Sequence, residues 1–562
     1  MTSRPLRLEA TADFRSITIG ELFDRQAAAA PDRLYFAHHT RNQAYSYGEF
    51  KELVDAAAKG LLAIGIRKGD HVAIWAGNVT EWVVTQYATA KIGAVLVTVN
   101  PSYQSTELEY LLGQSRTRAL VMSAGFRGTD YVAMLRKALP MIDAASPGSI
   151  ESEDYPSFRE AILIEGDRGA GFRSWANLLE RGRAISDLEL ADAQAATEPG
   201  DVINIQYTSG TTGFPKGAML SHANILGDAD LVGGSQNLGP DDVICAPVPF
   251  YHCFGCVMGV LTSLTRGCAL VTPHDHFDPA HTLDAVERFR ATALYGVPTM
   301  FIAELGDPRF GAVDLSSLRT GIMAGAPCPI EVMRDVVTRM GASQMTIAYG
   351  QTEASPVITQ TGADDTIERR VTTVGKALPG LEVRIVDPAT GEECATGAQG
   401  ELWARGFTIM AGYFDKPEET AAAIDPEGWL HTGDLATVDG EGYFKITGRL
   451  KDMVIRGGEN IYPREVEEFL FTHPAIREVQ CFGVPDPRFG EELAAWVRLK
   501  EGASLSQEEL VAFCRGRVSH FKIPRYLRIV DEFPMTVTGK VQKYKMREVM
   551  CAELDLQELE TA

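Results

Sequence analysis

The segment Tyr207–Gly217 reads YTSGTTGFPKG and carries the chemical groups that bind phosphate. Its glycines let backbone N–H groups turn toward an anion, its hydroxyls donate further hydrogen bonds, and its lysine supplies a positive charge. The spacing differs from the Walker pattern GxxxxGK[ST], so this is another kind of phosphate loop. We predict that the loop contacts are Thr208, Ser209, Gly210, Thr211, Thr212, Gly213 and Lys216.

Further short segments follow the loop in order: AGAP (324–327), YGQTE (349–353), HTGD (431–434), GRLKD (448–452) and PMTVTGK (534–540). Together with the loop, this series resembles the signature of the adenylate-forming superfamily. That superfamily includes acyl-CoA synthetases, luciferases and the adenylation domains of peptide synthetases. The overall pattern is most similar to the medium-chain fatty acyl-CoA synthetases. The resemblance implies that ATP activates a carboxylic acid as an acyl-adenylate, and that the thiol of CoA then displaces AMP.

The resemblance also implies which residues bind the nucleotide. Tyr349 offers a flat face for adenine, although a core tyrosine is the plain alternative, and small residues leave room for the ring. Asp434 can accept hydrogen bonds from both ribose hydroxyls, and the guanidinium of Arg449 can reach ribose or phosphate. The remaining residues implied by the adenine and metal segments are Gly325, Ala326, Pro327, Gly350, Gln351 and Thr352.

Three residues are implied in catalysis. Glu353 is a hard oxygen ligand that suits Mg²⁺ held against phosphates, and Thr208 is implied as the second contact to the metal. Lys540 follows a glycine in a turn that can present the ammonium inward. Negative charge builds on the α-phosphate and the pyrophosphate during adenylation, and a buried ammonium aimed at that charge lowers the barrier.

The same resemblance predicts a hinge at Lys451 and a small domain that swings about it. One orientation brings Lys540 to ATP. The other brings the GGEN segment, with Gly457, Gly458 and Glu459, to the acyl-adenylate, where glycines let the pantetheine arm of CoA pass close to the backbone. A plain β-turn is the alternative for this segment.

The acyl pocket is predicted around PFYHCFG (249–255), with Tyr251, His252 and Phe254, and around two flexible side chains, Met300 and Met323. A core histidine is the alternative for His252. The segment offers no aspartate to hold an α-ammonium, which argues against an amino-acid substrate. We therefore favour a fatty acid of medium or longer chain, with an aryl acid as the close rival. Transfer to a carrier protein, a luciferase-like oxygenase and a non-catalytic sensor are the other open alternatives.

Short β-branched runs alternate with helical stretches and must position these motifs. Strands are predicted at 71–76, 94–99, 118–123 and 202–207, and helices at 22–30 and 51–65. Such alternation predicts an α/β fold with parallel-rich sheets flanked by helices plus a β-subdomain. From about residue 440 the pattern changes to that of a small α+β domain. We predict an N-terminal domain over 1–450, with the ATP and acyl sites, and a mobile C-terminal domain over 451–562.

Composition excludes several classes of protein. The net charge of −22 opposes nucleic-acid binding, which needs a basic footprint. No run approaches the ~18 apolar residues of a transmembrane helix, and the N-terminus has no apolar run of signal-peptide type. The nine cysteines are scattered, and for Cys253 and Cys256 pocket lining is favoured over metal or redox chemistry. For His274 and His276 a surface turn is favoured, because a third metal ligand at recognisable spacing is missing. A cytoplasmic location is expected, and a homodimer is left open.

Overall fold

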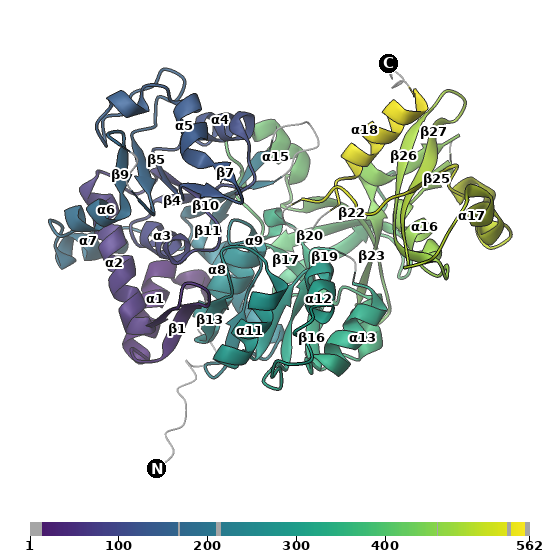
Figure 1. Cartoon of the computed structure of the whole chain (residues 1–562), viewed down its shortest axis with the longest axis horizontal. Helices are drawn as coiled ribbons and strands as arrows, with labels where there is room; N and C mark the ends of the chain where they lie inside the picture. The colour runs from purple at the N-terminus through teal and green to yellow at the C-terminus, as the bar shows by residue number, and fades with distance from the viewer. Residues whose placement is uncertain are drawn as a thin grey trace, which may run out of the picture. The chain divides into compact units, whose positions relative to one another are not determined.

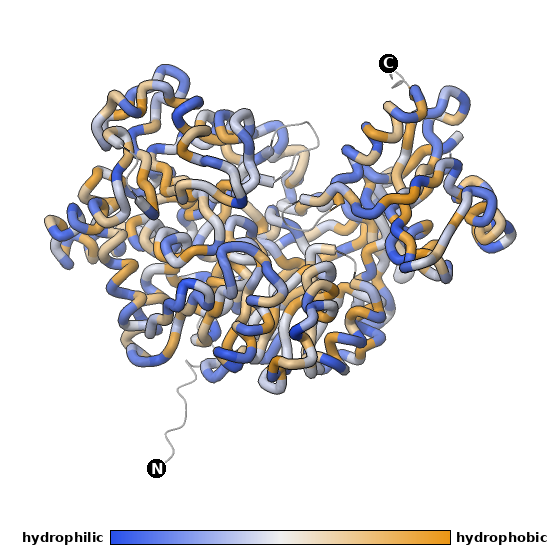
Figure 2. The backbone as a smooth tube through the Cα atoms, in the orientation of Figure 1, coloured by the Kyte–Doolittle hydropathy of each residue, from blue (hydrophilic) through white to orange (hydrophobic). Residues whose placement is uncertain are grey.

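The structure is a computed structural model, and it describes residues 14–166, 169–208, 215–326, 328–457, 459–536 and 541–556. The chain divides into two compact units, each of which is described by itself. The first contains residues 1–382 and 404–430, and the second contains residues 383–403 and 431–562. In Figure 1 the colour gradient follows the chain through both units, and in Figure 2 hydrophobic and hydrophilic stretches alternate along the chain in both of them.

One sheet of the first unit has, within the described residues, nine strands in the order β18-β17-β16-β15-β14-β12-β13-β1-β2. The six strands from β16 to β1 are parallel, and antiparallel strands lie at both edges. Their bounds are β1 (Leu34–His38), β2 (Gln43–Ser46), β12 (Val243–Cys245), β13 (Ala269–Thr272), β14 (Ala293–Gly296), β15 (Thr320–Ala324), β16 (Gln344–Gly350), β17 (Val357–Gln360) and β18 (Lys376–Ala377).

The second sheet of this unit has eight described strands in the order β21-β11-β10-β4-β3-β5-β8-β9. Strands β10 to β9 are parallel, and β11 and β21 extend the sheet in antiparallel fashion. Their bounds are β3 (His71–Trp75), β4 (Val95–Thr98), β5 (Ala119–Met122), β8 (Glu160–Leu163), β9 (Phe172–Ser174), β10 (Val202–Thr208), β11 (Lys216–Ser221) and β21 (Gly412–Tyr413). The strands predicted at 71–76, 94–99, 118–123 and 202–207 are all present.

Helices cover both sheets because their apolar stripes pack on the strands. The helices predicted at 22–30 and 51–65 are α1 (Ile19–Ala29) and α2 (Tyr47–Ala63). Three further helices share one buried core with β12 to β16, namely α11 (Pro279–Phe289), α12 (Pro298–Leu305) and α13 (Ile330–Arg339), which lie together in Figure 1. Helices α4 (Ser105–Gln114) and α5 (Tyr131–Ala138) share the core of the second sheet. The predicted α/β class with parallel-rich sheets is confirmed.

The second unit contains two sheets in the described residues. A four-stranded sheet in the described residues contains β19 (Leu381–Val386), β20 (Gly400–Gly406), β22 (Leu430–Val438) and β23 (Phe444–Arg449). A five-stranded sheet contains β24 (Val454–Arg456), β25 (Glu459–Ile461), β26 (Ile476–Asp486), β27 (Gly490–Leu499) and β28 (Tyr526–Ile529), and it packs with α16 (Pro463–Leu470), α17 (Gln507–Cys514) and α18 (Lys543–Leu554). Helix α16 begins with proline and has Glu465 in its first turn, as the sequence indicates.

None of the helices in the described ranges combines the length and the apolar character that crossing a bilayer requires. All nine cysteines are free thiols, which agrees with the scattered pattern in the sequence.

Candidate active site

The predicted phosphate loop connects two neighbouring antiparallel strands. Strand β10 ends at Thr208 and β11 begins at Lys216, and these two residues are partners in the register of the pair. The loop residues Ser209, Gly210, Thr211, Thr212 and Gly213 lie outside the described residues, as do Pro327, Gly458 and Lys540. The hairpin therefore places a hydroxyl and an ammonium on the two sides of the loop entrance.

Glu353 lies beside this entrance although it is 145 residues away from Thr208 in the sequence. The Thr208 hydroxyl is 3.3 Å from Glu353 Oε1, and the side chain of Glu353 is buried, with a relative exposure of 9%. Two cis ligands of an octahedral Mg²⁺ lie about 2.9 Å apart, given metal–oxygen distances of ~2.0–2.1 Å. The two oxygens therefore fit the predicted metal contact after a shift of a few tenths of an ångström.

Tyr413 completes this group, and our sequence analysis did not single it out. Its hydroxyl donates a hydrogen bond of 2.7 Å to Glu353 Oε1, and the Lys216 ammonium lies 4.2 Å from the centroid of its ring. Strand β21 brings Tyr413 there because it pairs with β11. Burial, with Glu353 as a further cause, raises the pKa of the Tyr413 phenol, so the hydroxyl remains a donor at neutral pH. Its only local signal is a Gly-Tyr pair, which predicts no contact with Glu353.

The predicted adenine segments meet because β15 and β16 are parallel neighbours. Ala324 pairs with Ala348, so the residues after β15, Gly325 and Ala326, come out at the same edge as Tyr349 and Gly350. Gly325 has a φ of +84°, which a side-chain-bearing residue adopts at a cost. Tyr349 is half-buried rather than a core side chain.

Gly350 and Thr352 show how closely this edge is packed. A Cβ on Gly350 would lie 1.9 Å from the carbonyl oxygen of Pro356, so only glycine fits the bend that follows β16. Gln351 comes next and is half-buried, and Thr352 is buried beside Glu353. The backbone thus turns Glu353 inward directly after the adenine segment.

The predicted acyl segment lies against the metal segment. His252 caps the short helix α9 (Cys253–Gly255), where its Nδ1 accepts a hydrogen bond of 3.1 Å from the backbone N–H of Phe254. Cys253 Sγ is 3.7 Å from the Thr352 hydroxyl. The half-buried Tyr251 and the buried Phe254 flank His252, so this part of the predicted acyl pocket borders the nucleotide segments.

Two other predicted acyl contacts have different surroundings. Met300 on α12 is buried with 6% relative exposure. Met323 is fully buried in the core shared by α11, α12 and α13, where its sulfur contacts Cys328 Sγ at 3.0 Å. Cys256, the second cysteine of the HCFGC segment, is also buried, and burial raises the pKa of its thiol, which disfavours a reactive thiolate.

The second unit carries the predicted ribose contacts as a pair. Asp434 on β22 and Arg449 on β23 are register partners, and Arg449 Nε lies 2.5 Å from Asp434 Oδ1. The Asp434 side chain is 8% exposed, whereas that of Arg449 is 56% exposed. The arginine therefore holds a buried carboxylate in place while more than half of its own side chain is exposed.

The predicted hinge and CoA contacts follow directly. Lys451 lies in the short helix η5 (Leu450–Asp452) and is exposed. Strands β24 and β25 form a hairpin in which Arg456 pairs with Glu459, and Gly457 donates a backbone hydrogen bond of 2.8 Å to the carbonyl of Phe489. Near the predicted lysine segment, the described residues Met535 and Val541 form an antiparallel bridge.

A pocket of about 550 Å³ lies elsewhere on the first unit. Arg116, Arg118 and Arg159 line it at the amino ends of β5 and β8, which is the edge of the sheet opposite to the predicted phosphate loop. Among the described residues, none of the predicted site residues lines this pocket.

The chain matches two family models, described as AMP-binding enzyme over residues 23–414 and AMP-binding enzyme C-terminal domain over residues 465–540. The chain belongs to the AMP-binding enzyme family. The predicted membership of the adenylate-forming superfamily is thereby confirmed.

Named relatives are similar over nearly the whole chain. A Bacillus subtilis (strain 168) protein named "Putative acyl-CoA synthetase YngI" is 53% identical over 94% of this chain and 96% of its own length. The mitochondrial medium-chain acyl-CoA ligase ACSF2 of Bos taurus is 42% identical over 96% of this chain and 88% of its own length. The ATP-bound structure of MatB from Rhodopseudomonas palustris is 30% identical, with a TM-score of 0.81, and covers 95% of this chain and 99% of that one.

Proposed function

We propose that this chain is an ATP-dependent fatty acid:CoA ligase that releases AMP and pyrophosphate. The observation that carries the proposal is the group at the loop entrance, where the Thr208 hydroxyl and the Glu353 carboxylate lie 3.3 Å apart beside Lys216. Membership of the AMP-binding enzyme family and relatives named acyl-CoA synthetase and acyl-CoA ligase support it.

In the adenylation step, the carboxylate oxygen of the acid attacks the α-phosphate of ATP and pyrophosphate leaves. Thr208 and Glu353 would hold Mg²⁺, which neutralises charge on the phosphates when it is bound. Tyr413 keeps the Glu353 carboxylate in position, and Lys216 adds positive charge at the entrance of the loop. Tyr349, Gly325 and Ala326 would enclose the adenine, because they emerge together at one edge of the sheet.

Residues of the second unit complete the proposed chemistry. Asp434 would accept hydrogen bonds from the ribose hydroxyls, since Arg449 holds its carboxylate in one place. Lys540 would stabilise the charge that develops during adenylation. In the second half-reaction the CoA thiol attacks the acyl carbonyl and AMP leaves. For this step we keep the predicted swing at Lys451 and the CoA contacts at Gly457, Gly458 and Glu459.

For the acid, we propose a medium or longer aliphatic chain. The segment at 249–255 contains no carboxylate that could pair with an ammonium. Its Cys253 lies 3.7 Å from the Thr352 hydroxyl, and Tyr251, His252 and Phe254 are its neighbours in the segment. The ACSF2 relative is named a medium-chain ligase, which supports the same substrate class. An aryl acid remains the second candidate, because the aromatic residues of this segment could also pack against a ring.

A panel of acids tests the function directly. Purified full-length protein is given ATP and Mg²⁺ with octanoate, palmitate, benzoate or an α-amino acid, and AMP is measured with and without CoA. We expect octanoate to give CoA-dependent AMP release and a stoichiometric thioester. Pyrophosphate release without thioester would favour a carrier-protein acceptor, and acid-dependent oxygen uptake would favour an oxygenase. Absence of AMP and pyrophosphate with every acid would contradict the proposal. A homodimer and a cytoplasmic location stay predictions.

A further inference from the structure

A group of histidines outside the candidate active site gathers at one edge of the nine-stranded sheet. Strands β1 and β13 are parallel neighbours, with His38 paired to Thr272, so the residues that follow the two strands come out side by side. His39 follows β1, the PHDHF segment follows β13, and helix α11 begins shortly afterwards. Topology therefore brings together histidines from positions near 39 and near 280 of the chain.

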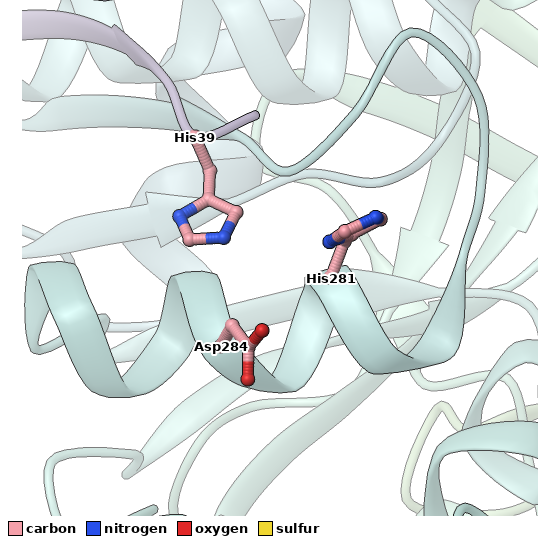
Figure 3. A group of neighbouring side chains, drawn as sticks. All are labelled: His39, His281 and Asp284. Carbon is pink, nitrogen blue, oxygen red and sulfur yellow. The ribbon is translucent and has the colours of Figure 1, made fainter. Parts of the chain in front are cut away.

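Three side chains in this group are arranged like a metal site. Ligand atoms of His39, His281 and Asp284 all lie within 4.8 Å of one another. His281 and Asp284 are three residues apart on α11, which places them on one face of the helix. Figure 3 shows the two imidazole rings and the carboxylate facing a common space.

The hydrogen-bond pattern leaves one nitrogen of His281 without a partner among the described residues. Nδ1 of His281 is buried and has no hydrogen-bond partner among the described residues. Nδ1 of His39 is also buried and unpaired, but it lies on the far side of its ring, and Figure 3 shows that Nε2 is the His39 nitrogen turned toward Asp284 and His281. Buried polar nitrogens are usually paired, so the orphaned Nδ1 of His281 in this group requires an explanation.

Neighbouring residues orient the three candidates. Arg309 Nη1 lies 2.8 Å from Asp284 Oδ2, which fixes the carboxylate on the helix. The ring of His274 stacks on that of His281 at a centroid distance of 5.2 Å and an interplanar angle of 5°. His38 is engaged elsewhere, because its Nε2 lies 2.9 Å from the carbonyl oxygen of Asn78. The sequence draws attention to His274 in the PHDHF segment. In the structure His274 is not one of the three candidate ligands, but it packs against His281, which is one of them.

We propose that His39, His281 and Asp284 bind one zinc ion that ties the end of β1 to helix α11, separately from the magnesium site at Glu353. Two imidazole nitrogens and one carboxylate oxygen form a donor set that Zn²⁺ takes readily, with water as the fourth ligand. Ligand atoms of a tetrahedral zinc lie about 3.4 Å apart, so the side chains must rotate inward by roughly 1 Å. The ligands come from two segments that only the fold joins, so bound zinc would crosslink the end of β1 and helix α11.

Zinc binding to the full-length protein tests the site. Protein stripped with a chelator is titrated with Zn²⁺ against a chromogenic chelator in excess Mg²⁺, and a Glu353→Gln variant removes the contribution of the magnesium site. We expect one tight site, weakened by at least ~10²-fold in His281→Ala, because loss of a mere second-shell partner costs ~10–100-fold. Asp284→Asn should behave similarly, whereas the exposed His520→Ala should bind as wild type does.

Two further measurements keep the proposal falsifiable if a variant folds poorly. Co²⁺ should give the strong ligand-field bands of a tetrahedral site in wild type and in Glu353→Gln. Zn²⁺ should also raise the melting temperature of wild type and of His520→Ala, and leave that of a folded Asp284→Asn unchanged. The proposal would be overturned if both His281→Ala and Asp284→Asn bound Zn²⁺ as tightly as wild type does. It would also be overturned if wild type bound Zn²⁺ no more tightly than these two variants. Neither result would affect the proposed ligase activity.

Discussion

Replacement of Tyr413 by phenylalanine removes one hydroxyl from the candidate active site and leaves the ring in place. That hydroxyl donates at 2.7 Å to Glu353 Oε1, whereas the Lys216 ammonium, 4.2 Å from the ring centroid, keeps its aromatic partner. A hydrogen bond to a charged group contributes about 1.5–3 kcal/mol, which corresponds to roughly 10- to 150-fold in an equilibrium constant. Because Thr208 also lies within hydrogen-bond distance of Oε1, we expect the lower end, about 10- to 30-fold.

The assay is acid-dependent exchange of pyrophosphate into ATP, measured against Mg²⁺ concentration at fixed ATP. We expect Tyr413→Phe to need about 10- to 30-fold more Mg²⁺ for half-maximal rate, with a smaller change in the rate at saturation. Tyr413→Leu, which also removes the ring beneath Lys216, should lose a further 2- to 5-fold, since a cation–π contact contributes about 0.5–1 kcal/mol. Tyr45→Phe is the matched control. Tyr45 lies on β2, the edge strand of the nine-stranded sheet that is farthest from β18, with five strands between β2 and β16.

A wild-type magnesium dependence in Tyr413→Phe would refute the reasoning, because the hydroxyl would then do nothing for Glu353. An equal loss at all magnesium concentrations would also refute it, since that pattern indicates a defect in folding or in the chemical step. The phenol should not add a limb to the pH profile near neutrality, because burial and Glu353 raise its pKa.

Three other changes test separate parts of the molecule. Lys540→Ala should slow adenylation by ~10²–10³-fold and largely spare thioester formation from supplied acyl-adenylate. Replacement of the exposed Lys545 by alanine should leave both half-reactions intact. Equal loss of both half-reactions in Lys540→Ala would contradict the proposed role of Lys540. Gly350→Ala should lower the free energy of unfolding by about 1–3 kcal/mol and raise the KM for ATP, because its Cβ would lie 1.9 Å from a carbonyl oxygen. Thermal unfolding and the pyrophosphate-exchange assay measure the two effects. Gly200→Ala, whose Cβ meets nothing within 4 Å, should show neither effect. Burial lowers the pKa of His222 to about 4, so the unfolded chain, which titrates near 6.5, takes up the proton first as the pH falls. The neutral His222 therefore contributes fully to stability above pH 6.5, and this contribution is lost as the pH falls toward 4. The free energy of unfolding should fall by about 2 kcal/mol from this cause between pH 7 and pH 5. In urea unfolding, His222→Asn should lack this part of the pH dependence, and an unchanged pH dependence in the variant would disprove the prediction.

Local pattern was sufficient for elements whose burial follows a simple period. The β-branched runs at 71–76 and 118–123 became β3 and β5, because strands buried on both faces read as continuous apolar stretches. Pro463 at the start of α16 was equally predictable, since proline fits a first helical turn.

The sequence by itself determined the chemistry of this protein, because the motifs from the phosphate loop to the lysine segment carry distinctive residue types in a fixed order. It identified Glu353 and Thr208 as partners through a resemblance, not through any local signal. Only the tertiary structure decided that Tyr413 joins them, because the contact depends on β21 pairing with β11. The same holds for His39, His281 and Asp284, which meet because β1 and β13 run in parallel. Spacing along a chain encodes helices and strands, whereas contacts between distant residues arise from the order in which strands assemble into sheets.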